Sequence, residues 1–306
     1  MAKILRNIDQ IIDTQGNELS IANPVEVPQQ LESFRNRFIN GNMQVHQRGN
    51  GTATAGTFTY ATDRWYVYCV GEGCSYSQVD TPTGKALEVI PDSGTTNQII
   101  AQKIENVNCL ELGGKTVTIS GKVYIDDVTG VTFNTNIYSA SSTNASYGSK
   151  VDFSSDLISG EYAYFSEQVT LPADAVNGVE VDFSFLNAGG RTIHVTDLQF
   201  EEGTVATPFE HRPYGLELSL CQRYCQKLRK FELCKMREYD RVSTGTYQFV
   251  TEMRAAPTIP ARTQNPDNLS VTVNEIDTLG FNGSLNRPTD GYGGTVNGGG
   301  VANAEL

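Results

Sequence analysis

Two adjacent acidic pairs are the residues whose types and spacing best suggest acid–base chemistry. They are Asp126-Asp127 and Glu201-Glu202. Hydrolysis of a glycosidic bond requires two carboxyl groups that converge on the bond, one of them with a raised pKa. Neighbouring residues of a strand point to opposite faces, so neither pair can converge in an extended chain. We therefore predict that Glu201-Glu202 is a polar strand end and Asp126-Asp127 a loop, while acidic residues distant in sequence can still meet in the fold.

Other catalytic motifs are absent from the sequence. It holds no Gly-x-Ser-x-Gly, no Walker Gly-Lys-Ser/Thr loop and no His-Glu-x-x-His. No two cysteines form a Cys-x-x-Cys pair, and a zinc site would need a second ligand pair at suitable spacing. Cys69 and Cys74 are close enough for a disulfide across a turn, but without an export signal reduced, hydrophobic cysteines are the preferred interpretation. We predict no enzymatic activity, no cofactor and no metal. The residues considered are Cys69, Cys74, Cys109, Cys221, Cys225, Cys234, His46, His194 and His211.

Aromatic side chains are the other candidates for chemistry. A sugar exposes a flat apolar face that stacks on tyrosine or tryptophan, and surrounding polar groups orient it. Trp65, the only tryptophan, shares a strand face with Val67 and Cys69, so we predict that it belongs to the core. Tyr147 and Tyr292 stand in polar, glycine- and serine-rich stretches and are the predicted glycan contacts. The alternative is that both are ordinary surface tyrosines.

The charge and composition exclude several classes of function. The formal net charge is −12, which disfavours a nucleic-acid-binding protein because phosphate attraction needs clustered Lys and Arg. No run of eighteen apolar residues predicts a membrane-spanning helix, and no basic stretch followed by an apolar one predicts a signal peptide. We expect a soluble protein made in a cytoplasm. Residues 223–241 hold seven basic and three acidic residues, which could bind an anionic partner or form a solvated helix face.

The elements that must position these residues are mostly strands. Short apolar runs with period two, separated by Gly-, Pro-, Asn- and Asp-containing turns, indicate an all-β chain. Such a pattern favours an antiparallel sandwich of jelly-roll type over residues 36–206. Gly113-Gly114 predicts a hairpin turn. The predicted strands are 38–45, 57–60, 64–70, 85–90, 97–104, 115–125, 131–139, 161–170, 179–186 and 192–200.

A change of period after residue 200 marks a domain boundary. Gly203 can take a positive φ, and Thr207-Pro208 and Arg212-Pro213 hold the chain extended. From Leu216 the apolar spacing becomes helical. The predicted organisation is an N-terminal segment (1–34), a β-sandwich (35–212), a connecting helix (213–230) and a small C-terminal β module (231–306).

Several motifs resemble those of one family in the family's own order. They are residues 35–51 (RNRFINGNMQVHQRGNG), 60–68 (YATDRWYVY), 97–125 (NQIIAQKIENVNCLELGGKTVTISGKVYI), 198–227 (LQFEEGTVATPFEHRPYGLELSLCQRYCQK), 253–259 (MRAAPTI) and 302–306 (ANAEL). Together they resemble bacteriophage tail-fibre and tail-tip proteins that contain a β-sandwich like that of carbohydrate-binding modules. The resemblance covers roughly residues 34–306, and Cys225 departs from it, since an aromatic residue is more usual there.

The resemblance implies a virion protein of the tail that binds a host-surface polysaccharide. It also implies that the N-terminal segment attaches to other tail proteins, although a loosely ordered leader is the alternative for residues 1–33. Two other functions stay open: a purely structural decoration or connector protein, and a glycan depolymerase. No repeat of fixed period, as in long β-helical spikes, is visible.

The resemblance further implies a homotrimer. Leu218, Cys221, Cys225 and Leu228 follow a three-four-three spacing that matches the a and d positions of a heptad, and we predict that they form the oligomer interface. One short helix cannot hold three chains together, so the glycine-rich C-terminal end would have to contribute. The alternative is that this stripe packs on its own chain.

Overall fold

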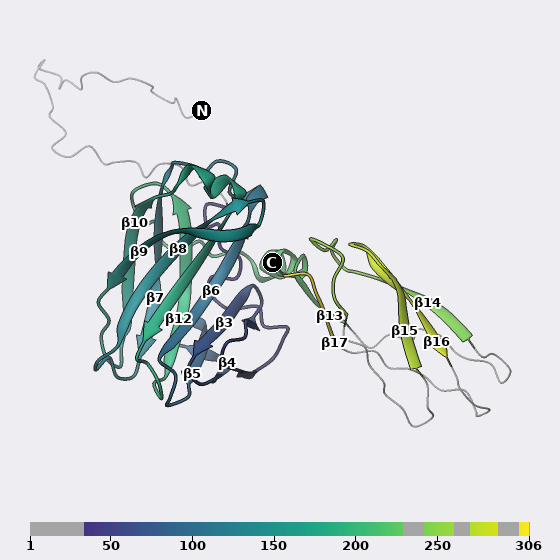
Figure 1. Cartoon of the computed structure of the whole chain (residues 1–306), viewed down its shortest axis with the longest axis horizontal. Helices are drawn as coiled ribbons and strands as arrows, with labels where there is room; N and C mark the ends of the chain where they lie inside the picture. Colours follow the sequence, from purple (N-terminus) through teal and green to yellow (C-terminus); the bar gives the residue numbers. More distant parts are fainter. Residues whose placement is uncertain (1–33, 229–241, 260–269, 287–299, 306) are drawn as a thin grey trace, which may run out of the picture. The chain divides into compact units, whose positions relative to one another are not determined.

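The computed structural model describes residues 34–228, 242–259, 270–286 and 300–305, and residues 36–228 contain an antiparallel β-sandwich (Figure 1). Sheet 1 has the strand order β1 (Gly51–Ala53), β4 (Cys74–Thr81), β5 (Gly84–Pro91), β12 (Ile193–Glu202), β7 (Thr116–Ile125), β10 (Tyr162–Thr170). Sheet 2 has the order β2 (Thr59–Thr62), β3 (Trp65–Val70), β6 (Asn97–Glu105), β11 (Gly178–Leu186), β8 (Thr132–Ser142), β9 (Ala145–Ser155).

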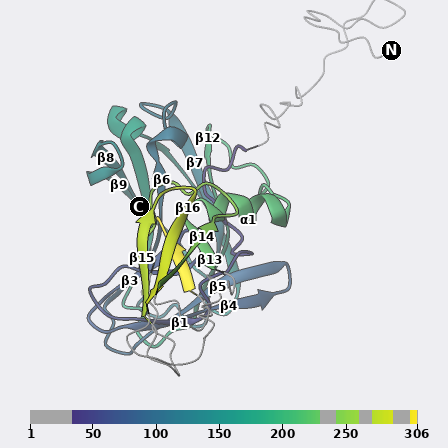
Figure 2. The ribbon, with the colours of Figure 1, turned by 90° about the vertical axis from the view of Figure 1, so that its right-hand side faces the viewer.

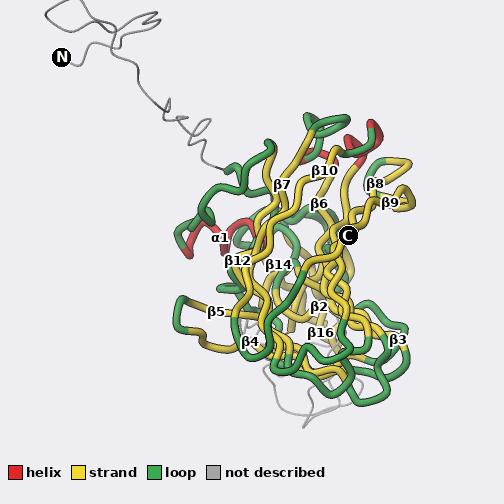
Figure 3. The backbone as a smooth tube through the Cα atoms, turned by 90° about the vertical axis from the view of Figure 1, so that its left-hand side faces the viewer, coloured by secondary structure: helices red, strands yellow, loops and turns green. Residues whose placement is uncertain are grey.

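From β5 onward the chain passes from one sheet to the other at every strand except the β8–β9 hairpin. Two short 3₁₀ helices, η1 (Asn106–Asn108) and η2 (Ala173–Asn177), lie in the connections. Every strand pairing in the sandwich is antiparallel, and strands distant in sequence become neighbours, as β6 and β8 do on either side of β11. The predicted jelly-roll-type sandwich is confirmed, and strands dominate the tube in Figure 3.

Alternating apolar residues build the core between the sheets. Trp65 is fully buried, as predicted, with its ring 5.0 Å from Phe38 and 6.1 Å from Phe183. Its indole nitrogen donates to the Asn40 carbonyl oxygen at 2.9 Å, so the buried polar atom has a partner. Alternation in β12 is interrupted where a register shift separates Thr196 from Gln199, which returns Leu198 and Phe200 to the core.

Some strand predictions were wrong. The short strand β1 was missed, β4 and β9 were missed because their sequences are polar, and residues 38–45 form bends and turns rather than a strand. Gly113-Gly114 does not join a hairpin, since β6 and β7 belong to different sheets. Gly114 nevertheless has φ +72°, which glycine adopts without strain.

The predicted helix is shorter than its apolar spacing suggested. Helix α1 (Tyr214–Gln222, Figure 2) ends before Cys225, which begins the strand β13 (Cys225–Leu228). Tertiary contacts override the helical pattern here: the Tyr224 hydroxyl donates to Glu105 at 2.7 Å, and the Ala304 amide donates to the Tyr224 carbonyl at 2.8 Å. Within the described part of the chain α1 is the only α-helix, and it is neither long nor apolar enough to cross a membrane.

The predicted oligomer stripe is therefore not one face of a helix. Leu218 and Cys221 lie on α1, whereas Cys225 and Leu228 lie on β13. Cys221 and Leu218 pack with Ile39, and Cys225 is fully buried in its own chain. The alternative, intrachain packing, holds for these side chains, so they cannot form a heptad seam.

The described C-terminal residues form a small β module. Strands β14 (Val242–Gln248), β16 (Gly280–Asn286) and β15 (Ser270–Ile276) make an antiparallel sheet, and β13 pairs with β17 (Gly300–Asn303). Its core contains Leu228, Phe249, Met253, Phe281, Ala302 and Ala304.

A buried ionic cluster holds the end of the chain. The Glu305 carboxylate, 2% exposed, pairs with Arg48 at 3.0 Å and with Arg64. The Arg64 guanidinium also lies 3.6 Å from the centre of the Tyr224 ring and donates to the Lys103 carbonyl. These contacts join the motif at 60–68, through Arg64, to the motif at 302–306, through Glu305.

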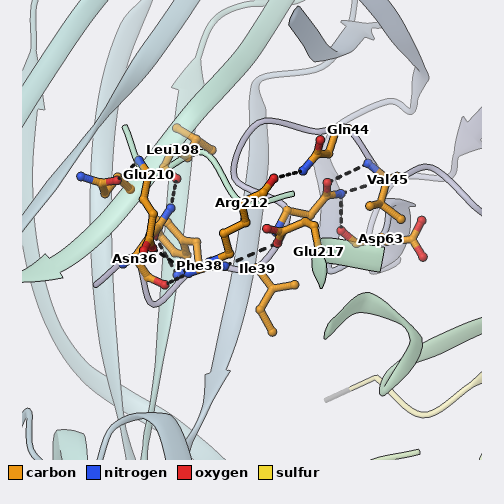
Figure 4. A network of polar contacts seen from close by, with 12 residues as sticks. Asn36, Phe38, Ile39, Gln44, Val45, Asp63, Leu198, Glu210, Arg212 and Glu217 are labelled. Carbon is orange, nitrogen blue, oxygen red and sulfur yellow. Dashed lines mark hydrogen bonds and ion pairs between the residues drawn. The ribbon is translucent and has the colours of Figure 1, made fainter. Parts of the chain in front are cut away.

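A second buried network explains the motifs at 35–51 and 198–227 (Figure 4). The Asn36 amide oxygen accepts from the backbone amides of Phe38 and Phe200, each at 3.0 Å. Arg212 donates to the Phe38 carbonyl at 3.0 Å and pairs with Glu217 at 3.5 Å, and the Glu217 carboxylate accepts from the Asn40 amide. The side chains of these motif residues make buried contacts within the fold, so they are not candidates for a binding site.

Candidate functional site

The outer face of sheet 2 carries the strongest concentration of site-forming chemistry among the described residues. Side chains on β3, β6, β8 and β11 alternate between the core and this face. The outward residues, together with Phe58 of the loop before β2, form what we call the aromatic–carboxylate face. Its members are Phe58, Tyr66, Tyr68, Lys103, Asn136, Tyr138, Tyr147, Glu180 and Asp182.

Aromatic rings occupy the β2–β3 side of this face. Phe58 is 63% exposed, and its ring lies 4.7 Å from Tyr68 and 5.3 Å from Tyr66, the latter pair edge-to-face. The Lys103 ammonium lies 5.8 Å from the Phe58 ring centre and 6.0 Å from that of Tyr66. Exposed phenyl and phenol rings beside a cation form a platform on which a planar, partly apolar ligand can stack.

Hydrogen-bonded carboxylates occupy the middle of the face, on β11. Glu180 accepts a hydrogen bond from the Tyr66 hydroxyl, and Asp182 accepts one from the Asn136 amide on β8. Residues two apart on a strand share a face, so both carboxylates point the same way. Their partners fix their positions in advance of any ligand, which lowers the entropic cost of binding.

Tyr147 on β9 lies at the far side of this face. The Lys103 ammonium lies 5.2 Å from its ring centre, so the same cation contacts rings from both sides. The Tyr147 hydroxyl and the Asn136 side-chain oxygen are both buried and have no hydrogen-bond partner among the described residues. Buried polar atoms normally have partners, so these two atoms are exceptions within the described part of the chain.

Burial keeps the tyrosines of the face protonated. Loss of solvent contact, and secondarily the carboxylates Asp182 and Glu180, raise the pKa of Tyr138 to about 12. Burial first, then Glu180, raises the pKa of Tyr147 to about 12, and the same two causes raise the pKa of Tyr66 further. At neutral pH these hydroxyls are therefore hydrogen-bond donors. The face thus offers rings for stacking, hydroxyl and ammonium donors, and carboxylate acceptors, which is the chemistry that orients a sugar.

Of the two predicted glycan contacts, Tyr147 and Tyr292, the structure describes only Tyr147. Tyr147 lies at the aromatic–carboxylate face, but on an edge strand rather than in the polar loop expected for it. Tyr292 lies outside the described residues. Most of the basic segment, residues 229–241, also lies outside them, and Arg223 pairs with Glu105 at 3.4 Å.

The acidic pairs lie as predicted and do not converge. Glu201 is buried and accepts from the amide and hydroxyl of Thr207 at 2.8 and 2.7 Å, whereas exposed Glu202 pairs with Lys115 at 3.3 Å. Asp127 lies in the loop after β7 and pairs with Arg191 at 3.0 Å. Neither pair belongs to the aromatic–carboxylate face.

Sequence reasoning missed the central residues of the site. The alternation over residues 178–186 puts Glu180 and Asp182 outward between core residues Val179, Val181 and Phe183, which is a readable signal. Tyr66 and Tyr68 lie on a strand whose two faces are both apolar in the sequence, so the pattern does not mark their side of the strand as a site. Tyr66 is 2% exposed, and its ring packs against Phe58, a member of the face, and against Tyr60.

Metal and disulfide chemistry are not evident in the described ranges. No cluster of three or more His, Cys, Asp or Glu side chains there is arranged to hold a metal ion. The cysteines described are free and buried, and burial raises the pKa of the Cys109 thiol to about 12. This agrees with their interpretation as small hydrophobic residues.

With the fold and face established, comparisons with known proteins add partial similarities. No protein-family model matches the sequence, and no curated protein sequence matches it. Among solved structures, the enzymatically active domain of tailspike protein 4 of bacteriophage CBA120 is 13% identical with a TM-score of 0.37, over 55% of this chain and 22% of that one. The C-terminal family 22 carbohydrate-binding module of Clostridium thermocellum Xyn10B is 11% identical with a TM-score of 0.37, over 58% of this chain and 100% of that one.

A family 61 carbohydrate-binding module in complex with β-1,4-galactotriose is 10% identical with a TM-score of 0.33, over 55% of this chain and 99% of that one. The chain thus spans about a fifth of the tailspike domain's length and all or nearly all of the two modules. At these identities and scores, we base the functional proposal on the geometry of the face alone.

Proposed function

We propose that the protein is a non-enzymatic glycan-binding protein and that the aromatic–carboxylate face is its binding site. One observation carries the proposal: aromatic rings, among them the 63% exposed Phe58, lie on the same face as carboxylates that hydrogen bonds hold in place. If a sugar ring stacks on Phe58 and Tyr68, its hydroxyl groups would lie near the side chains of Glu180, Asp182 and Asn136. Each stacking ring contributes on the order of 1 kcal/mol, so single-site affinity is weak and several copies on one particle would raise it.

The binding test uses the full-length chain and two substitutions on the face. Tyr68→Ala removes a partly exposed ring, and Glu180→Gln removes a charge while keeping an acceptor for Tyr66. We expect each to weaken retention on immobilised polysaccharides in affinity electrophoresis by roughly five- to tenfold. The matched control is Tyr214→Ala, a 55% exposed tyrosine on α1, which should bind as the unmodified protein does. Equal retention of all four proteins would refute the site.

Binding without catalysis is supported by the contacts of the two carboxyl groups. Glu180 and Asp182 are held in place by hydrogen bonds from Tyr66 and Asn136, which suits groups that orient a ligand. Glycoside hydrolysis needs in addition a carboxyl group that delivers a proton to the leaving oxygen, and the proposal assigns neither group that role. The proposal predicts that polysaccharide incubated with the protein keeps its chain length in size-exclusion chromatography. Shortening of the polymer that Glu180→Gln or Asp182→Asn abolishes would favour the depolymerase alternative instead.

We further propose that the protein belongs to a bacteriophage tail and acts in adsorption to a host-surface polysaccharide. The support is the ordered set of sequence motifs, not the solved-structure similarities. Immunogold labelling of virions with an antibody against this chain is the direct test, and label on the head would contradict it. An antibody that labels the tail without blocking adsorption would favour a purely structural role. Attachment through residues 1–34 stays a prediction, because residues 1–33 lie outside the description.

A homotrimer stays a proposal that rests on the same resemblance. Of the residues first predicted for its interface, Cys221, Cys225 and Leu228 are buried within one chain and Leu218 is half-buried, so we expect another surface to supply most of the contacts. Light scattering on the full-length protein should give about three times the chain mass of 33.4 kDa. A monomeric mass would overturn the proposal.

A further inference from the structure

A row of side chains crosses the outer face of sheet 1, opposite the proposed glycan site. Ser77, Glu88, His194, Tyr124 and Tyr162 are directly paired in register on the neighbouring strands β4, β5, β12, β7 and β10. The chain neighbours of Glu88, His194 and Tyr124 belong to the core between the sheets, so the row points away from it. We call these five residues the sheet-1 row.

Polar contacts lock the row from end to end. The Ser77 hydroxyl donates to Glu88 at 3.0 Å, the His194 Nε2 lies 3.0 Å from the other Glu88 oxygen, and the Tyr162 hydroxyl lies 2.8 Å from His194 Nδ1. Because a carboxylate only accepts, His194 donates to Glu88 through Nε2, and in the neutral tautomer this requires, Nδ1 accepts from the Tyr162 hydroxyl. The Tyr124 ring stacks on His194 at 4.8 Å and 25°. The rings are therefore ordered although this side of the sheet has no core to fill.

The neighbouring row extends the aromatic surface. Tyr164, 60% exposed, lies two residues from Tyr162 on the same side of β10. It is paired in register with Lys122, whose ammonium forms an ion pair with Asp197 at 2.8 Å. Further along the sheet, the outward positions of β7 are occupied by Ser120 and Thr118. Tyrosines are thus concentrated at one end of this face and absent from the outward β7 positions at the other end.

We propose that the sheet-1 row and Tyr164 form a second carbohydrate-binding surface, one that takes a neutral glycan. Exposed Tyr164 and the half-buried, ordered rings of Tyr124 and Tyr162 supply stacking area at low entropic cost, and the charged groups beside them supply both acceptors and a donor. Glu88 contacts His194, and Asp197 pairs with Lys122. The two carboxylates thus outnumber the one ammonium beside the rings, which disfavours an anionic sugar or a phosphate. With one surface on each sheet, a single chain can hold two glycan strands, which raises avidity on a polymer.

The test separates this surface from the first one. Calorimetry with soluble xylohexaose, cellohexaose and maltohexaose is run on the unmodified chain, on Tyr68→Ala, on Tyr164→Ala and on Tyr214→Ala as the control. For at least one probe we expect two hexasaccharides bound per unmodified chain and one per chain of Tyr68→Ala. In the double variant, with Tyr68→Ala and Tyr164→Ala together, the remaining site should bind roughly five- to tenfold more weakly.

The other outcomes are equally decisive. Loss of all binding in Tyr68→Ala, or binding unchanged by Tyr164→Ala in that background, overturns the second surface while the first stands. Binding lost in Tyr164→Ala but kept in Tyr68→Ala supports the second surface and refutes the first. No binding of any probe overturns the neutral-glycan assignment. A lower mass of Tyr164→Ala in light scattering, without a change in binding, would identify the surface as a contact between copies instead.

Discussion

Replacement of Glu305 tests whether the buried ionic cluster holds the fold together. In Glu305→Ala the Arg64 guanidinium, whose side chain is 1% exposed, loses its carboxylate partner, and Arg48 loses its partner as well. Burial alone lowers the pKa of Arg64, but Glu305 and then Tyr224 raise it above its ordinary value, so the arginine stays charged in the fold. Breaking a buried pair by removing one partner costs about 3–5 kcal/mol. Arg64 keeps the Lys103 carbonyl and the Tyr224 ring, so we expect a loss near 3 kcal/mol.

That loss is large against a total stability of about 5–15 kcal/mol for a globular protein. Urea unfolding followed by Trp65 fluorescence should show it as a lower midpoint with an unchanged slope. The control is Glu111→Ala, an 80% exposed glutamate 3.9 Å from Arg37, which should change the free energy of unfolding by less than about 0.5 kcal/mol. Arg64→Met combined with Glu305→Leu should recover most of the loss, because apolar residues can replace a buried pair. If Glu305→Ala unfolds at the same urea concentration as Glu111→Ala, the cluster does not stabilise the fold as argued.

Three further predictions follow from buried groups. Burial, only partly offset by the Asn40 amide and by Arg212, raises the pKa of the Glu217 carboxyl group in the folded protein. The contribution of Glu217 to stability is therefore fully present below the ordinary glutamate pKa of about 4.3. That contribution is lost as the pH rises through the higher pKa of the folded state. The stability of the unmodified protein relative to Glu217→Gln should therefore be greatest near pH 4 and fall by pH 7 in urea titrations, and the opposite trend would show that the Arg212 ion pair dominates. Trp65 should emit at short wavelength and resist acrylamide quenching until unfolding, and water-like emission from the native protein would contradict its burial. In a Cys234→Ser background, native protein at pH 8 should react with an aromatic disulfide reagent far more slowly than unfolded protein, since burial raises the pKa of Cys109 to about 12; rapid native labelling would contradict this.

The fold class could be predicted from the sequence because apolar and polar residues alternate along a half-buried strand. Residues 193, 195, 198 and 200 alternate through a bulge, and residues 65, 67 and 69 alternate without one, so these strands and the burial of Trp65 could be inferred locally. Strand β9 lacks that signal: its serine- and glycine-rich start reads as a loop, and only pairing with β8 makes it a strand. Tyr147 was therefore predicted as a glycan contact in a polar loop, whereas the structure places it on strand β9.

The helix after residue 213 shows where local periodicity misleads. The apolar spacing through Leu228 favours a long helix, yet Tyr224 is held by Glu105 and by the Ala304 amide, and Cys225–Leu228 pairs with β17. Glu105 and Ala304 lie 119 and 80 residues from Tyr224, and the β17 partners lie 72 to 78 residues from the β13 residues with which they pair, so no local window of the sequence contains them. Nonlocal hydrogen bonds and burial outweigh a modest helical preference.

The sequence by itself therefore determined the strand-rich fold, the burial of Trp65 and the divergence of the adjacent acidic pairs, because these follow from alternation along one strand. Only the tertiary structure decided which distant strands lie side by side. Strand order brings Glu180 next to Tyr66, Asp182 next to Asn136, and His194 between Glu88 and Tyr124. Each of these contacts joins residues on different strands, and strand pairing is set by the packing of the whole core rather than by any local pattern.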